Sequence, residues 1–148
     1  MKIIDPVPSE GSDLKGLFTM IKPSLSTLAK IYIQFNIDDE KHNGPLAGLC
    51  HELEKMAGIN VVETIKLLIW IDSDYDCTRW SELDDVLMGS PESWPALREV
   101  SLSFNVTRMT RKKSHNLDKA LRELPMTKLV ESKRVKFDFQ VKEFRINP

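Results

Sequence analysis

The chain has 148 residues, a net charge of −1 and 41% hydrophobic residues, which is typical of one globular domain with its own core. The balanced charge gives no bulk attraction to nucleic acid or anionic lipid, and the longest apolar run, at 67–71, is far too short to span a membrane. The start of the chain lacks the apolar stretch of a secretory signal. Two cysteines do not make a disulfide framework, so we expect reduced thiols in a cytoplasmic or nuclear protein.

The first predicted element is a short amphipathic helix that ends before Pro23. Its apolar residues recur at helical spacing, and they are Leu14, Leu17, Phe18 and Ile21. Because the terminal repeats of a repeat protein need a cover on their outer side, we expect this helix to cap the elements that follow.

Four later segments alternate apolar and polar residues, as half-buried strands do. They are 28–36, 62–71, 97–105 and 132–141. Aligned on their first strongly apolar residues, they recur at intervals of 34, 35 and 35 residues; these residues are Ile31, Ile65, Val100 and Val135. Helical patterns fill the gaps at 43–58, 78–89 and 114–125, the first of them with Pro45 at its first position and Gly58 as its terminator. Strand and helix alternating at this interval indicate an internal repeat with parallel strands.

Two architectures fit such a repeat. A doubly wound sheet has helices on both faces and reads as continuous apolar strands, whereas a leucine-rich-repeat-like solenoid leaves one sheet face in water. Here three strands alternate cleanly. Their outward positions carry polar side chains or tyrosine, which are Tyr32, Gln34, Ser101, Ser103, Lys136 and Asp138. We therefore predict an α/β solenoid of about four repeats, with parallel strands and the helices on one face.

The spacing L-x-x-L-x-L-x-x-N, typical of leucine-rich repeats, supports this prediction in part. It runs from Leu28 to Asn36 and from Leu97 to Asn105, but Trp70 and Gln140 take the place of the asparagine in the second and fourth repeats. A continuous ladder of asparagines is therefore not expected.

Several motifs resemble the degenerate leucine-rich repeats of F-box and F-box-like proteins from mushroom-forming fungi. They are "GPLAGLCHELEKMAG", "NVVETIKLLIWIDSD", "WSELDDVL", "WPALREVSL" and "ESKRVKFDF". The resemblance covers about 24–141. It implies a repeat fold without a catalytic residue. The 23 residues ahead of it are too few for an F-box, so ubiquitin-ligase assembly is not implied.

The resulting domain prediction is one repeat domain over 1–148. It consists of an N-terminal tail and capping helix at 1–23, four repeats at 24–141 and a C-terminal tail at 142–148. That last tail is too short to cover the fourth strand, which leaves homodimerisation through this edge open.

Three aspartates, Asp72, Asp74 and Asp76, follow the second strand directly. An EF-hand loop would need Gly and Glu where Cys77 and Leu83 stand, so calcium binding is disfavoured. A strand that ends in D-x-D is also how some magnesium-dependent enzymes begin their metal site, and Asp72 with Asp74 fits that outline. We favour a simpler interpretation, in which the aspartates form a polar turn and cap the next helix.

The function that we predict is a non-enzymatic protein-binding module without cofactor, metal, nucleic-acid or membrane partner. The alternative is a small metal-dependent enzyme or ligand-binding protein that uses Asp72 and Asp74. Two surfaces could hold the protein partner. One is the outward sheet face, with Tyr32, Gln34, Lys66, Leu68, Trp70, Ser101 and Ser103, and the other is the rim of loops after the strands, where Asp72, Asp74 and Asp76 face a basic loop with Arg108, Arg111, Lys112 and Lys113.

Overall fold

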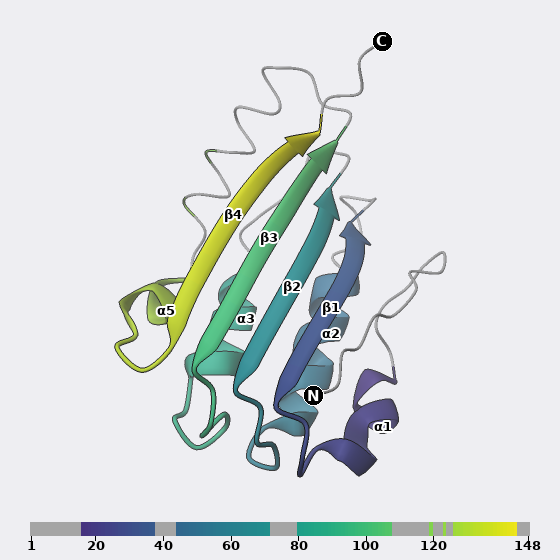
Figure 1. Cartoon of the computed structure of the whole chain (residues 1–148), viewed down its shortest axis with the longest axis vertical. Helices are drawn as coiled ribbons and strands as arrows, with labels where there is room; N and C mark the ends of the chain where they lie inside the picture. Colours follow the sequence, from purple (N-terminus) through teal and green to yellow (C-terminus); the bar gives the residue numbers. More distant parts are fainter. Residues whose placement is uncertain are drawn as a thin grey trace.

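The computed structural model describes residues 16–37, 44–71, 80–107 and 126–144, together with Lys119 and Glu123. Four parallel strands form one sheet in sequence order (Figure 1). They are β1 (Lys30–Ile37), β2 (Thr64–Ile71), β3 (Glu99–Thr107) and β4 (Lys136–Phe144). The predicted parallel sheet, with its strands in chain order and helices between them, is confirmed.

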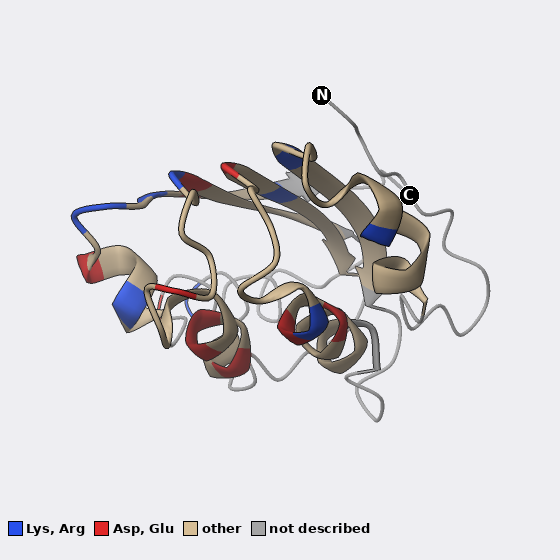
Figure 2. Cartoon of the chain, turned by 90° about the horizontal axis from the view of Figure 1, so that it is seen from below, with Lys and Arg blue, Asp and Glu red and all other residues tan. Residues whose placement is uncertain are grey.

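The described helices cover one face of this sheet and its two sides. The long helices α2 (Gly44–Met56) and α3 (Trp80–Met88) lie against one face, as Figure 2 shows from the end of the sheet. The short helix α1 (Leu17–Ile21) and the 3-10 turn η1 (Lys22–Ser24) lie beside β1, and α5 (Thr127–Glu131) lies at the β4 side. No described helix is long and apolar enough to cross a membrane. The helix predicted at 114–125 lies outside the described residues, apart from Lys119 and Glu123.

The core lies between the sheet and the two long helices. On β1, Ile31, Ile33 and Phe35 are at most 1% exposed, and the equivalent positions of β2 and β3 are equally buried. Trp80 at the start of α3 packs edge-on against Phe104 of β3, with 5.2 Å between the ring centroids. The period-two pattern of the strands therefore arises because alternate side chains enter this core.

A buried corner precedes each of the first three strands. Leu28, Val62 and Leu97 are buried in these corners, each two residues ahead of its strand. The sequence pattern had included these residues in the strands. The corners are also joined by backbone hydrogen bonds from one repeat to the next. The Ala29 carbonyl accepts from Glu63 and Thr64, the Glu63 carbonyl accepts from Arg98 and Glu99, and the Arg98 carbonyl accepts from Lys136.

The fourth repeat departs from the predicted alignment by two residues. Val100 pairs with Phe137, where the sequence spacing had placed Val135. The cause is a turn after α5, in which the Ser132 hydroxyl accepts hydrogen bonds from the backbone N–H groups of Arg134 (3.2 Å) and Val135 (3.0 Å). This turn delays the strand until Lys136. Because the shift is an even number, Phe137 and Phe139 still face the helices, as predicted.

Each short flanking helix is held at its N-terminus by a buried carboxylate from a long helix. Glu52 of α2 accepts a hydrogen bond from the backbone N–H of Gly16, at the start of α1. Asp84 of α3 accepts from the N–H groups of Lys128 and Leu129, both at 2.9 Å, at the start of α5. Neither helix has a side-chain cap of its own, so these carboxylates satisfy backbone donors that would otherwise be left without a partner.

The turns before β2 and β3 are tied together by Asn60, which is 4% exposed. Its amide group donates to the carbonyl oxygens of Met56 (2.9 Å) and Ser93 (3.0 Å), while its side-chain oxygen accepts from the N–H of Val62. The Ser93 carbonyl also accepts from Gly58, whose φ of 80° ends α2 at the predicted terminator.

Candidate protein-binding surface

The sheet face that points away from α2 and α3 is called the open face here. Its side chains come from every second residue of the strands, and the paired register places them in four rows that cross β1, β2, β3 and β4 in that order. The rows are Lys30, Thr64, Glu99, Lys136; Tyr32, Lys66, Ser101, Asp138; Gln34, Leu68, Ser103, Gln140; and Asn36, Trp70, Asn105, Lys142. All seven side chains predicted for the sheet-face site share this face.

The register also gives the neighbours of each side chain. Trp70 lies between Asn36 and Asn105, and Tyr32 lies beside Lys66, two rows away. In the fourth repeat Lys142, rather than Gln140, occupies the position equivalent to Trp70, because of the two-residue shift of β4.

The apolar centre of the open face consists of Leu68 and Trp70. Both are partly exposed, whereas Ile69 and Ile71, their neighbours on β2, are completely buried on the opposite face. Trp70 is therefore not a residue of the main core. Next to it, Asn105 is only 5% exposed, and its side-chain oxygen accepts no hydrogen bond from the described residues.

Charge differs between the two sides of the molecule. The open face carries four exposed lysines against two acidic side chains, Glu99 and Asp138; the lysines are Lys30, Lys66, Lys136 and Lys142. On the helices α2 and α3, three carboxylates and one lysine are exposed, while Glu52 and Asp84 are buried, and Figure 2 shows the acidic residues of these helices beneath the sheet. A partner of the open face would thus meet a weakly basic surface, and a partner of the helices an acidic one.

The predicted rim lies outside the described residues. This holds for Asp72, Asp74 and Asp76, and also for Arg108, Arg111, Lys112 and Lys113. Only the ends of the strands that lead to these loops are placed, at Ile71 and Thr107. The rim and the metal-dependent alternative both remain predictions.

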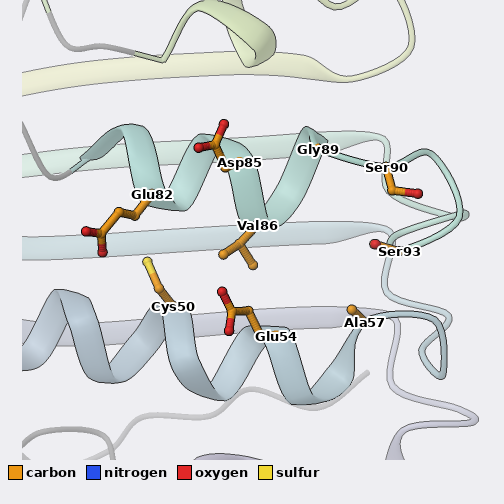
Figure 3. Close-up of a pocket in the computed structure, with 9 residues that line it drawn as sticks. All are labelled: Cys50, Glu54, Ala57, Glu82, Asp85, Val86, Gly89, Ser90 and Ser93. Atoms are coloured by element: carbon orange, nitrogen blue, oxygen red, sulfur yellow. The ribbon is translucent and has the colours of Figure 1, made fainter.

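A groove of about 410 Å³ separates α2 from α3 on the helix side (Figure 3). The carboxylates of Glu54, Glu82 and Asp85 line it, and Ser90 and Ser93 lie at one end. Among the described residues, no three His, Cys, Asp or Glu side chains converge closely enough to hold a metal ion. The groove is an acidic depression without a set of metal ligands.

The thiol of Cys50 points into this groove from α2. Burial, together with the nearby carboxylates of Glu82 and Glu54, raises the pKa of Cys50 to about 12. Since the thiolate is the nucleophilic form, this thiol is unreactive at neutral pH. His51, the next residue, is exposed on another side of the helix, so the two side chains do not form a catalytic pair.

The sequence pattern had not singled out the two asparagines beside Trp70 as surface residues. The sequence pattern placed Asn36 and Asn105 at the asparagine position of the leucine-rich-repeat spacing, at the end of their predicted strands. Here the strands continue to Ile37 and Thr107, so both residues stay within the sheet and belong to the open face. The alternation of their strands was the signal that would have placed them there.

The chain was compared with protein families, curated proteins and solved structures. No family model, no curated protein and no solved structure matches this chain.

Proposed function

We propose that the chain is a short βα solenoid of the leucine-rich-repeat-like kind, related to the repeat part of F-box-like proteins, and that it binds another protein. Three features support the solenoid: strands in chain order, buried corners ahead of the first three strands, and carbonyls that link each corner to the next repeat. In such folds every repeat contacts only its neighbours, and the sheet supplies an extended binding surface.

The observation that carries the binding proposal is the partly exposed pair Leu68 and Trp70 on a face whose other side chains, in the four rows that cross all the strands, are polar or tyrosine. An aromatic side chain with polar neighbours is typical of the centre of a protein interface, because it buries a large area at a low cost in side-chain entropy. The flanking carboxamides of Gln34 and Asn36 can then bond polar backbone groups of the partner.

The partner that best fits this face presents an apolar side chain to Trp70 and carboxylates around it. Two of the four lysines lie near the apolar centre: Lys66 is in the row next to Leu68, and Lys142 is in the same row as Trp70, two strands away. Acidic residues on the partner would meet these lysines at the rim of the interface, where they mainly affect the association rate.

The test is a comparison of captured partners between variants. The wild-type chain, Trp70→Ala, Lys66→Glu and the control Val130→Ala serve as bait in a lysate of the native cells. Val130 is 64% exposed but lies on α5, away from the open face, so it removes an exposed apolar side chain elsewhere.

A protein bound through the open face is retained by Val130→Ala. Its affinity falls roughly tenfold or more with Trp70→Ala, the loss expected for a central aromatic, and falls less with Lys66→Glu. Thermal melts of all four chains are expected to agree within a few degrees, since the altered side chains lie outside the core. Capture that is equal in all four chains would contradict the proposal.

A separate melt tests the alternative based on Asp72 and Asp74. A ligand that binds only the folded state raises its midpoint, so Mg²⁺, Mn²⁺ and Ca²⁺ are added in turn at millimolar concentration. We expect no shift. A rise with one of these ions that Asp72→Asn abolishes would favour the metal-dependent function instead.

A further inference from the structure

The described core is incomplete at the edge strand β4. Phe137, Phe139 and Val141 face the helices but remain partly exposed. Their counterparts Val100, Leu102 and Phe104 on the neighbouring strand β3 are completely buried. The inner face of β4 therefore retains apolar surface that a further strand at this edge would help to cover.

The backbone of β4 is also free on its outer side among the described residues. Lys136 donates its N–H to the Arg98 carbonyl of the preceding repeat, so the even-numbered residues of β4 direct their backbone groups toward β3. The odd-numbered residues, Phe137, Phe139 and Val141, direct theirs outward. Such a row of donors and acceptors is a template for another strand.

Charged side chains usually prevent two edges from pairing, and β4 carries Lys136, Asp138 and Lys142 on the open face. In an antiparallel pair of two β4 strands, residues opposite each other point to the same face, and the identity of the strands makes every contact occur twice. The order of the charges then decides which registers are favourable.

Gln140 is the middle residue of β4, and five registers place the two-fold axis within two residues of it. With the axis at Val141, no two charged residues of the open face are opposite each other, and with the axis at Lys142 two lysines face each other. With the axis at Asp138, two aspartates face each other. With the axis at Phe139, Lys136 faces Lys142 twice. With the axis at Gln140, Asp138 faces Lys142 of the other copy twice, and the glutamine faces its own copy. Only this last register combines opposite charges, and like charges directly opposite are destabilising.

On the inner face, this register contains one apolar pair. Phe139 lies opposite Val141 of the second copy, and because both are odd-numbered they exchange backbone hydrogen bonds with their outward N–H and C=O groups. An aromatic side chain opposite a β-branched one is among the favourable cross-strand pairs.

We propose that two copies of this chain associate through β4, antiparallel and with Gln140 on the two-fold axis, to form one continuous sheet of eight strands. The interface rests on β4 and does not depend on the binding proposed for the open face. A pair of nine-residue strands buries less surface than a typical stable dimer, so the association is weak and depends on concentration.

Sedimentation velocity tests the proposal at protein concentrations from about 10 µM to about 1 mM and at low salt. A weak dimer becomes populated at the highest of these concentrations. The wild type is expected to shift from monomer to dimer. Asp138→Lys and Lys142→Asp each turn both opposite-charge pairs into like-charge pairs, and each is expected to weaken self-association roughly tenfold or more.

The decisive sample is an equal mixture of Asp138→Lys and Lys142→Asp. In a heterodimer of the two, both pairs again combine a lysine with an aspartate, so dimerisation is expected to return to the wild-type level. The double variant Asp138→Lys/Lys142→Asp is expected to dimerise alone for the same reason. Lys66→Glu, an exposed charge change on β2, is the control and leaves dimerisation unchanged.

Both altered side chains are exposed, so the variants are expected to fold, and equal melting midpoints at low concentration check this. A wild type that stays monomeric throughout the range would overturn the proposal. So would a dimer that the single charge changes leave intact, or one that the mixture does not restore, since each result excludes the register centred on Gln140.

Discussion

The two edges of the sheet are flanked by similar short helices, but their edge strands are covered to different extents. Beside β1, a helix of five residues is held by the buried carboxylate of Glu52; beside β4, another helix of five residues is held by the buried carboxylate of Asp84. Yet Phe35 on β1 is 1% exposed, whereas Phe139 on β4 remains partly exposed.

The difference comes from what each short helix contributes to the core. Both α1 and the turn after it supply large apolar side chains, with Leu17, Ile21 and Leu25 all buried. In α5 only Leu129 is buried, together with Met126 just before it, while Val130 is 64% exposed. A buried carboxylate thus fixes the position of a helix, but the apolar residues of that helix decide whether it closes the edge of a sheet.

The largest expected effect comes from removing the cover of the β1 edge. A chain without residues 1–23 loses Leu17 and Ile21 and is expected to aggregate, because the core that they cover becomes exposed. The milder change Ile21→Ala should lower the free energy of unfolding by about 2–5 kcal/mol, the range for a buried large-to-small substitution. Denaturant melts measure it.

Met20→Ala is the control for this change. Met20 lies on the same helix and is 54% exposed, so its loss should alter stability by no more than about 0.5 kcal/mol. Equal effects of the two changes would mean that α1 does not cover the core.

A matched pair of phenylalanines compares the two edges directly. Phe35→Ala should cost about 3–5 kcal/mol because the ring is completely buried, and Phe139→Ala roughly half as much because its ring is only partly covered. Both are read from denaturant melts at low protein concentration, where the monomer prevails. If Phe139→Ala proved the costlier change, the β4 edge would be the better covered of the two.

Two adjacent aspartates of α3 test how α5 is held. Asp84→Ala leaves the N–H groups of Lys128 and Leu129 without their acceptor and should cost about 2 kcal/mol, as for hydrogen bonds to a buried charge. Asp85→Ala removes an exposed ion pair with Lys128 and should cost less than about 0.5 kcal/mol. Equal melting midpoints for the two variants would show that Asp84 does not anchor this helix.

The smallest expected effect is the pH dependence of the stability that Glu52 gives to the β1 edge. Burial alone would raise the pKa of Glu52, but the hydrogen bonds from Lys55 and from the backbone of Gly16 and Leu17 outweigh it and lower the pKa. The stabilisation from the ionised group is therefore fully present above the pKa of the unfolded chain, and it is lost as the pH falls through the lowered folded value.

We expect Glu52→Gln to be less stable than the wild type near pH 7, by on the order of 1 kcal/mol, with the two stabilities converging in acid. Urea melts between about pH 7 and pH 3 follow this difference. Glu54→Gln, at an exposed position of the same helix, is the control and should show no such convergence. A constant gap at every pH would exclude an ionised Glu52 as the source.

The period-two and helical patterns were sufficient to predict the sheet and its two long helices. The alternation around Ile31, Ile65 and Val100 identified the strands, their order and the faces of their side chains. This was possible because the position of a residue within its own strand determines whether its side chain enters the core. The helix before Gly58 was likewise predicted from local signals, a first-turn proline and a glycine terminator.

Features that depend on distant contacts were not predictable in this way. The helix α5 has only five residues and no side-chain cap, and its stability comes from Asp84, more than forty residues earlier in the chain. The two-residue shift of β4 follows from the Ser132 turn, which no periodicity reveals. Asn60 bonds the carbonyl of Ser93 in the turn before β3, and Trp94 is completely buried in the same turn, where the sequence has no regular pattern.

The order of the strands has a consequence for how the protein is made. Each strand pairs only with the strands next to it in the chain, and β1 never contacts β4. On the ribosome, β1 can therefore pair with β2 as soon as both emerge, since this pairing does not await the C-terminal part. Synthesis then adds one repeat at a time onto a surface that is already formed, and β4, the strand with the exposed edge, is the last to join.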